Sequence, residues 1–498
     1  MTMTYKNSNQ QTSLDTERDT SHRLLLQKAD ASIRQALPTV SDTHRLHYHL
    51  MPQAHWMNDP NGLAYYRGYY HVFYQHHPYS SDWGPMHWGH ARTKDFITWE
   101  HLPIALAPSE DYDADGCFSG SAVVEGDLLH LFYTGHRVID GELIQVQCKA
   151  TSSDGIHLIK DRRNPLITSF PSDGSPDFRD PKVWRHHGSW YMVLGSGRDG
   201  RGNVLLYKSQ DLTQWEYVGV LAHSDGTQGT IWECPDLFPL GDRHVLLISP
   251  MGVKDRRVMY FVGDMDYDVG KFTPEYVGTL DYGPDFYAVQ TFSGTERRLM
   301  LAWMDAWECD IPSKKDNWAG ALTLPRELVL DESGKLRAQP LPELQKLRQR
   351  SISVARSFVV EKDQSMPLTD LQDACLELNL VLALNSSTAS HFTLCFCYTE
   401  SSEQILIRYN KATGELYLDT SKIHVGQPGL YKAALHPPGE RLELRIFLDR
   451  SSIEVFANQG EATITARIYP RSQTTIPRVF ALDGQIKVKS LECWNLAK

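Results

Sequence analysis

Apolar and aromatic residues recur at regular intervals along the first two thirds of the chain. A turn followed by a short apolar run begins at five points, namely Arg67 (RGYYHVFYQ), Glu125 (EGDLLHLFYTG), His187 (HGSWYMVLGS), Leu240 (LGDRHVLLIS) and Thr295 (TERRLMLAW). Aromatic and β-branched residues dominate these runs, and Gly- and Asp-containing turns separate them without helical periodicity. Evenly spaced short strands are typical of propeller blades, so residues 47–340 are predicted to form a five-bladed β-propeller.

The pattern changes on both sides of the repeats. Residues 21–37 (SHRLLLQKADASIRQAL) have apolar positions at helical spacing just before Pro38, which predicts a short helix within an N-terminal extension over residues 1–46. Residues 341–350 predict a helical linker. From 351 to 498, short alternating strands lack the aromatic repeat and predict a C-terminal β-sandwich. The predicted fold is therefore all-β.

Charge and composition exclude two classes of partner. The chain has 498 residues, 22% of them charged, and a formal net charge of −11. Nucleic acids and anionic membranes attract clustered Lys and Arg, so we expect neither as a partner. The first residues are polar and lack the apolar core of a signal peptide, and no run of about 18 apolar residues occurs. We therefore expect a cytoplasmic protein.

The metal-binding residue types show no ligand pattern. The 8 cysteines have no CxxC spacing, and the 21 histidines have no HExxH spacing. We expect free thiols, no metal site and no cofactor.

Three acidic residues occupy the same phase of the repeat. Asp59, Asp180 and Glu233 each precede the turn of their own repeat by roughly eight residues, the position of the innermost strand of a blade. Innermost strands line the central channel of a propeller. We therefore expect the three carboxylates to converge at one end of that channel.

The neighbours of these acids indicate different protonation states. Arg179 adjoins Asp180 and favours its ionised form, whereas Glu233 lies between Trp232 and Cys234, surroundings that raise a carboxyl pKa. One ionised and one protonated carboxylate beside aromatic side chains are the groups that glycoside hydrolysis needs. Taken singly, the three acids have structural alternatives: a turn at WMNDPNG, an ion pair at FRDP and a buried, hydrogen-bonded Glu at WECPD.

The motifs resemble those of one known family in the same order. WMNDPNG, FYQHHP, FSGSAVV, FRDPKVW, WECPDLF, DFYAVQTF and LRIFLDRSSIEVF are similar to motifs of the glycoside hydrolase family of invertases, fructan hydrolases and sucrose-6-phosphate hydrolases. The resemblance covers almost the whole chain and is strongest to intracellular bacterial members. One departure is Val289, which stands where the DFYA stretch of the family commonly continues with Pro, so we expect altered loop geometry beside Tyr287.

The resemblance implies roles for particular residues. It implies Asp59 as nucleophile, Glu233 as acid/base and Asp180 as the stabiliser of the transition state. It also implies a fructosyl pocket formed by Trp56, Met57, Asn58, Gln75, Trp83, Phe118, Ser119, Arg179 and Trp303.

The expected activity is that of a retaining β-fructofuranosidase on sucrose or sucrose-6-phosphate. A fructan hydrolase or fructosyltransferase would use the same acids, and a sugar-binding propeller without catalysis is a further alternative, which the three phased acids disfavour. Phosphate recognition needs a basic group at the rim, for which Lys314, Lys315, Arg92 and Arg137 are candidates, with solvated surface as the alternative. The expected partner is a small sugar, namely sucrose, sucrose-6-phosphate or a short fructo-oligosaccharide, and monomer and homodimer both remain open.

Overall fold

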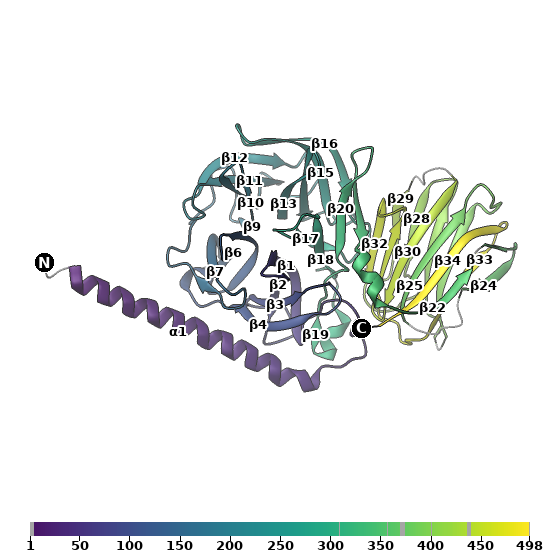
Figure 1. Ribbon diagram of the computed structural model, residues 1–498, viewed down its shortest axis with the longest axis horizontal. Helices are drawn as coiled ribbons and strands as arrows, with labels where there is room; N and C mark the ends of the chain where they lie inside the picture. The colour runs from purple at the N-terminus through teal and green to yellow at the C-terminus, as the bar shows by residue number, and fades with distance from the viewer. Residues whose placement is uncertain are drawn as a thin grey trace.

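The computed structural model describes residues 4–307, 309–355, 357–368, 374–399, 401–435 and 440–497. Strands dominate these residues, after one α-helix, α1 (Thr4–Ala36), at the N-terminal end (Figure 1). No helix in the described part of the chain is long and apolar enough to cross a lipid bilayer. The same residues contain no group of three or more His, Cys, Asp or Glu side chains placed to hold a metal ion.

Helix α1 is longer than the predicted helix over residues 21–37. It begins at Thr4 and gives way at Leu37–Thr39 to a 3₁₀ turn that contains Pro38. The extra N-terminal part, residues 4–20, consists mainly of polar residues such as Thr, Asn, Ser and Asp and has no apolar stripe, so apolar periodicity does not reveal it. Near its C-terminal end, Ala29 and Ile33 pack against Ile104 of β4 (Glu100–Leu106).

Residues 55–340 form five sheets in which antiparallel strands follow one another in chain order. The sheets are β1 (His55–Tyr66), β2 (Tyr69–His77), β3 (His87–Thr93) and β4; β5 (Gly116–Glu125), β6 (Leu128–Ile139), β7 (Glu142–Ser152) and β8 (Ile159–Lys160); β9 (Arg179–His186), β10 (Ser189–Arg198), β11 (Arg201–Ser209) and β12 (Glu216–His223); β13 (Trp232–Leu240), β14 (Arg243–Pro250), β15 (Met259–Asp266) and β16 (Lys271–Thr279); β17 (Tyr287–Thr291), β18 (Leu299–Trp303), β20 (Arg326–Leu330) and β21 (Leu336–Pro340). The short strand β19 (Trp318–Ala319) pairs in parallel with β1.

The first strands of the five sheets are neighbours in space. Strand β1 contacts β5, β5 contacts β9, β9 contacts β13, β13 contacts β17, and β17 contacts β1 again. The outer strands β4, β12 and β16 lie away from this centre (Figure 1). The turns of the sequence repeat, such as Arg67–Gly68 and His187–Gly188, join first and second strands, and Gly68 and Gly188 have positive φ angles of 80° and 85°. The repeat therefore marks the innermost hairpin of each sheet.

The C-terminal part is a β-sandwich of two sheets. A 3₁₀ turn at Pro342–Leu347 replaces the predicted linker helix over residues 341–350, because β22 already begins at Arg348. One sheet contains β22 (Arg348–Ala355), β34 (Ile486–Leu496), β25 (Cys375–Ala383), β30 (Arg441–Asp449), β31 (Ser452–Ala457) and β32 (Ala462–Arg467), with β23 (Phe358–Val360) beside β34. The other contains β24 (Gln364–Pro367), β33 (Thr475–Ala481), β26 (His391–Tyr398), β27 (Gln404–Asn410), β28 (Glu415–Asp419) and β29 (Leu430–Ala434). Leu, Ile and Phe side chains of both sheets form its core.

A disulfide within the sandwich corrects the expectation of eight free thiols. Cys395 and Cys397 of β26 are bonded to each other. They are two residues apart on one strand, so their side chains point to the same face. A search for CxxC spacing does not detect this pair.

Buried charges join the sandwich to the five sheets. Arg326 of β20 pairs with Asp281 at 2.8 Å and with Glu454 of β31 at 2.6 Å. His49 bridges Glu454 and Asp449 at 2.9 and 2.7 Å. All five side chains are at most 1% exposed. We call these five residues the boundary cluster.

Candidate active site

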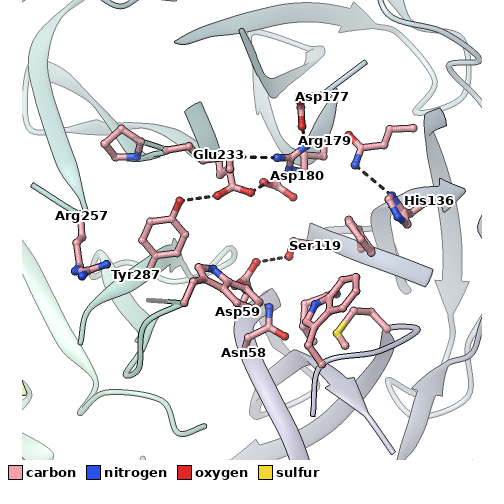
Figure 2. A pocket seen from close by; sticks show the side chains of 18 of the residues that line it. Asn58, Asp59, Ser119, His136, Asp177, Arg179, Asp180, Glu233, Arg257 and Tyr287 are labelled. Atoms are coloured by element: carbon pink, nitrogen blue, oxygen red, sulfur yellow. Dashed lines mark hydrogen bonds and ion pairs between the residues drawn. The ribbon is translucent and has the colours of Figure 1, made fainter. Parts of the chain in front are cut away.

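A cavity of about 560 Å³ opens where the N-terminal ends of the five first strands meet. Asp59 of β1, Asp180 of β9 and Glu233 of β13 all line it, as Figure 2 shows. The first strands also contribute Asn58 of β1, Phe118 and Ser119 of β5, Arg179 of β9 and Tyr287 of β17. Residues far apart in the sequence thus share one site because they occupy the same position in successive sheets.

The backbone of the first strands is irregular beside the cavity. Pairing with the second strand is shifted between Met57 and Pro60 in β1 and between Glu233 and Asp236 in β13. Asp180 has a φ of 65°, in the left-handed region that few non-glycine residues adopt. Bulges of this kind re-aim side chains. Local strand geometry therefore turns the carboxylates toward the cavity.

Asp59 is a partly buried carboxylate held by two donors. Ser119 Oγ donates to Asp59 Oδ2 at 2.6 Å, and Asn58 Nδ2 donates to Oδ1 at 3.0 Å. Burial, together with the nearby charge of Glu233, raises the pKa of Asp59 to about 6, against the effect of these hydrogen bonds. Asp59 is therefore oriented, and it is mostly ionised at neutral pH.

Glu233 faces Asp59 in Figure 2. Tyr287 Oη donates to Glu233 Oε2 at 2.5 Å, and Arg179 Nε donates to Oε1 at 3.1 Å. Each carboxylate oxygen thus has one donor. The side chain is 19% exposed, so it remains accessible from the cavity.

Asp180 lies beside Glu233, and its carboxylate accepts a hydrogen bond from a backbone N–H group of β13, the first strand of the next sheet. The N–H of Cys234 donates to Asp180 Oδ2 at 2.9 Å. The Cys234 thiol lies between two carboxylates, 3.6 Å from Asp180 Oδ2 and 3.8 Å from Asp59 Oδ2. Burial raises the pKa of Asp180, the neighbouring carboxylates add to the rise, and Arg179 opposes it.

Arg179 opposes the rise in the pKa of Asp180, the direction that its adjacency predicted, but its hydrogen bonds go to other residues. Its Nη1 donates to Asp177 at 2.6 Å and to Gln145 at 3.1 Å, while its Nε donates to Glu233. Successive side chains of a strand point to opposite sides, so sequence neighbours seldom pair directly. Arg179 therefore positions the acid of the next sheet.

The structure divides the nine predicted pocket residues into two groups. Asn58, Gln75, Trp83, Phe118, Ser119 and Arg179 line the cavity. Trp56, Met57 and Trp303 are 3%, 0% and 0% exposed and are not among the described lining residues. Trp56 supports the pocket from behind, because its indole Nε1 donates to Asn58 Oδ1 at 2.7 Å and its ring packs beside that of Trp303.

Several lining residues escaped the sequence analysis. His136 stacks on Phe118 with ring centroids 3.9 Å apart, and Trp307 stacks on Trp56 at 5.7 Å while remaining 48% exposed. His136 is at the end of β6 and Trp307 is in a loop, so neither shares the phase of the acids. Asp177 is the one of these residues that the sequence could have indicated, because it lies only three residues before Asp180. Val289, the departure from the family pattern, is fully buried in the irregular part of β17.

The basic residues near the cavity are not those predicted. Lys314 pairs with Asp82 and Asp310, both at 3.1 Å, and Arg92 pairs with Glu100. Neither Arg92 nor Arg137, Lys314 or Lys315 is among the described residues that line the cavity. The cations that line it are Arg179, Lys254 and Arg257.

Comparison with known proteins places most of the chain in one family. The model for the glycosyl hydrolases family 32 N-terminal domain matches residues 49–340, and the model for the family 32 C-terminal domain matches residues 343–495. A sucrose-6-phosphate hydrolase of Escherichia coli is 41% identical over 90% of this chain and 94% of its own length. A raffinose invertase of Escherichia coli is 40% identical over 90% and 94%. The structure of a family 32 β-fructofuranosidase of Bombyx mori has a TM-score of 0.83, 34% identity and coverage of 95% of this chain and 98% of that one.

Proposed function

The chain belongs to glycosyl hydrolases family 32, and we propose that it hydrolyses sucrose or sucrose-6-phosphate through a covalent fructosyl-enzyme intermediate. The bond cleaved is the terminal β-D-fructofuranosyl bond. The observation that carries the proposal is the meeting of three carboxylates from three sheets in one cavity, two of them facing each other (Figure 2). The names of the E. coli relatives and of the B. mori structure support this activity.

The architecture proposed for this activity is a five-bladed β-propeller over residues 47–340. An N-terminal extension over 1–46 precedes it, and a linker over 341–350 leads to the sandwich over 351–498. The closed ring of contacts among β1, β5, β9, β13 and β17 supports this arrangement, since propeller blades meet through their innermost strands.

Asp59 is the proposed nucleophile. Ser119 and Asn58 hold its two oxygens, so the carboxylate keeps one orientation during attack. At neutral pH it is mostly ionised and can attack the anomeric carbon of the fructosyl unit, as the nucleophile of a retaining glycosidase does. A covalent fructosyl ester forms as the glycosidic bond breaks.

Glu233 is the proposed acid/base. In the first step it gives its proton to the glycosidic oxygen, and in the second it takes a proton from the water that attacks the ester. Tyr287 and Arg179 fix its orientation through separate oxygens. The leaving sugar must therefore lie on the Glu233 side of the cavity.

Asp180 is proposed to stabilise the transition state. Its Oδ2 is bound to the Cys234 N–H, which orients the carboxylate toward the space between the other two acids. There it can accept hydrogen bonds from fructosyl hydroxyls and favour the positive charge that develops on the ring. Gln75, Trp83, Phe118 and Arg179 form the proposed walls of the fructosyl pocket, with Trp56, Met57 and Trp303 behind them.

The product anomer tests this function. Two successive inversions at the anomeric carbon predict β-fructofuranose as the first product. NMR spectra recorded in the first minutes of sucrose hydrolysis, before mutarotation, measure it. Initial release of α-fructofuranose would exclude Asp59 as nucleophile, and absence of hydrolysis of both sucrose and sucrose-6-phosphate would exclude the function.

A further inference from the structure

Two cations in the cavity have no part in the proposed reaction. Lys254 and Arg257 belong to the segment between β14 and β15 and line the same cavity as the three acids. Arg179, the third lining cation, is already bound to Glu233 and Asp177. Lys254 is exposed, and its ammonium group forms no ion pair with any residue that the structure describes.

The segment that carries these cations is anchored beside the proposed acid. In the β13–β14 pair, Trp232 lies opposite Pro250 and Glu233 opposite Ser249. The pairing continues past β14, where the Met251 N–H donates to the Ile231 carbonyl at 2.9 Å. Lys254 and Arg257 therefore lie only three and six residues beyond Met251, whose backbone is hydrogen-bonded to the strand that carries Glu233.

Arg257 lies on the Tyr287 side of the cavity in Figure 2. The Tyr287 hydroxyl bonds to Glu233, so Arg257 is on the side of the acid and across from Ser119. Arg257 is 9% exposed. Burial raises the pKa of Asp285, and Arg257 is close enough to oppose that rise.

The proposed mechanism assigns the sides of the cavity to different parts of the substrate. The nucleophile and the acid approach the scissile bond from opposite directions, so the leaving sugar lies beside Glu233. In sucrose-6-phosphate the phosphate is on the glucosyl unit, which is the leaving sugar. Its phosphate must therefore project from the Glu233 side, toward the segment that contains Lys254 and Arg257.

We propose that Lys254 and Arg257 bind the phosphate of a phosphorylated leaving sugar and select sucrose-6-phosphate over sucrose. This inference rests on the proposed function and adds to it the residues that favour sucrose-6-phosphate over sucrose. A guanidinium offers paired donors to phosphate oxygens, and an ammonium group adds a mobile charge. The comparisons leave this choice open, because relatives of nearly equal identity include both a sucrose-6-phosphate hydrolase and a raffinose invertase.

The test compares two substrates in the same variants. In the wild type, kcat/KM for sucrose-6-phosphate should exceed that for sucrose. Loss of one charge-assisted hydrogen bond should lower this ratio by about tenfold in Lys254→Ala and in Arg257→Gln. The double variant should bring the ratio close to one. Competitive inhibition adds a second measurement: glucose 6-phosphate should inhibit the wild type more strongly than glucose does, and Lys254→Ala should reduce that difference.

Arg256→Ala is the matched control. Arg256 has the same charge in the same segment, but its Nη2 bonds to the Thr227 carbonyl at 3.1 Å and it is not among the described lining residues. Its substrate ratio should stay within about twofold of the wild type. Lys254 is exposed, so its variant should fold even where Arg257→Gln does not.

Failure of this inference differs from failure of the proposed function. Sucrose and sucrose-6-phosphate hydrolysed equally well by the wild type, or an unchanged ratio in Lys254→Ala and the double variant, would overturn the phosphate site and leave the hydrolase intact. Hydrolysis of neither substrate would overturn both.

Discussion

Two groups of buried carboxylates in this molecule have opposite electrostatic character. In the boundary cluster, Glu454 and Asp449 have lowered pKa values despite complete burial. In the cavity, burial raises the pKa of Asp59 and Asp180. Desolvation acts to raise the pKa in both groups, so the difference must come from their partners.

The boundary cluster supplies a partner for each negative charge. Glu454 accepts hydrogen bonds from Arg326, from His49 and from the Leu324 N–H, at 2.6 to 2.9 Å. Asp449 accepts them from His49 and from two backbone N–H groups. These donors outweigh the cost of desolvation, so the carboxylates remain ionised.

The cavity has too few partners for its acids. Arg179 is shared among Glu233, Asp177 and Gln145 and makes no hydrogen bond to Asp180 or Asp59 within the described residues. Carboxylate oxygens that accept few hydrogen bonds from the protein can accept them from substrate hydroxyls, and their negative charge can stabilise a positive charge that develops on the substrate. The fold therefore satisfies its structural charges, whereas ionisation of the proposed catalytic carboxylates costs free energy.

The largest expected effect is on activity. Asp59→Asn should reduce kcat/KM on sucrose by at least about 10⁴-fold, because the amide cannot form the covalent bond, while the near-isosteric side chain retains the fold. Steady-state hydrolysis and circular dichroism measure the two properties. Substantial residual turnover by the pure variant would show that Asp59 is not the nucleophile.

Glu233→Gln is the matched variant for this prediction. It should be strongly impaired on sucrose, but a fructoside with a good leaving group needs no proton and should restore formation of the covalent intermediate. Mass spectrometry of the intact protein detects that adduct. Equal losses on both substrates would indicate a structural role for Glu233.

The second prediction concerns the boundary cluster. Arg326→Met should destabilise the protein by about 3–5 kcal/mol, because Asp281 and Glu454 would remain buried without their cation. Thermal and urea unfolding measure the effect. The control is Arg243→Met, which removes two surface ion pairs, with Asp264 and with Glu275, and should change the unfolding midpoint little. An equally small change in Arg326→Met would contradict the contrast between the two charge groups.

The smallest effect is a gain in stability at the cavity. The pKa of Asp59 rises from 3.8 to about 6 on folding, so its ionisation costs stability above pH 6 and costs none below pH 4, where it is protonated in both states. Asp59→Asn removes this cost and should be more stable than the wild type by on the order of 2 kcal/mol at pH 7.5. The gain should shrink by about half at pH 5. Urea midpoints at the two pH values measure it, and a variant less stable than the wild type at pH 7.5 would contradict the argument.

Most of the strands and the common position of the three acids follow from local patterns in the sequence. Alternating apolar residues and glycine turns set the strands and hairpins locally, and a repeated phase brings Asp59, Asp180 and Glu233 to the same ends of successive sheets. The loss of the aromatic repeat after residue 350 likewise marked the start of the sandwich. The family resemblance stated from the motifs is confirmed by matches over residues 49–340 and 343–495.

Only the tertiary structure decided which side chains meet. It paired Arg179 with Glu233, placed Trp56 and Trp303 behind the pocket, and brought Lys254 and Arg257 to the cavity in place of the basic residues that the sequence suggested. Strand periodicity fixes the face on which a residue lies, but bulges at the cavity end change that direction, and loop residues have no period at all. Partners that come from different sheets depend on how the sheets pack, which no local pattern records.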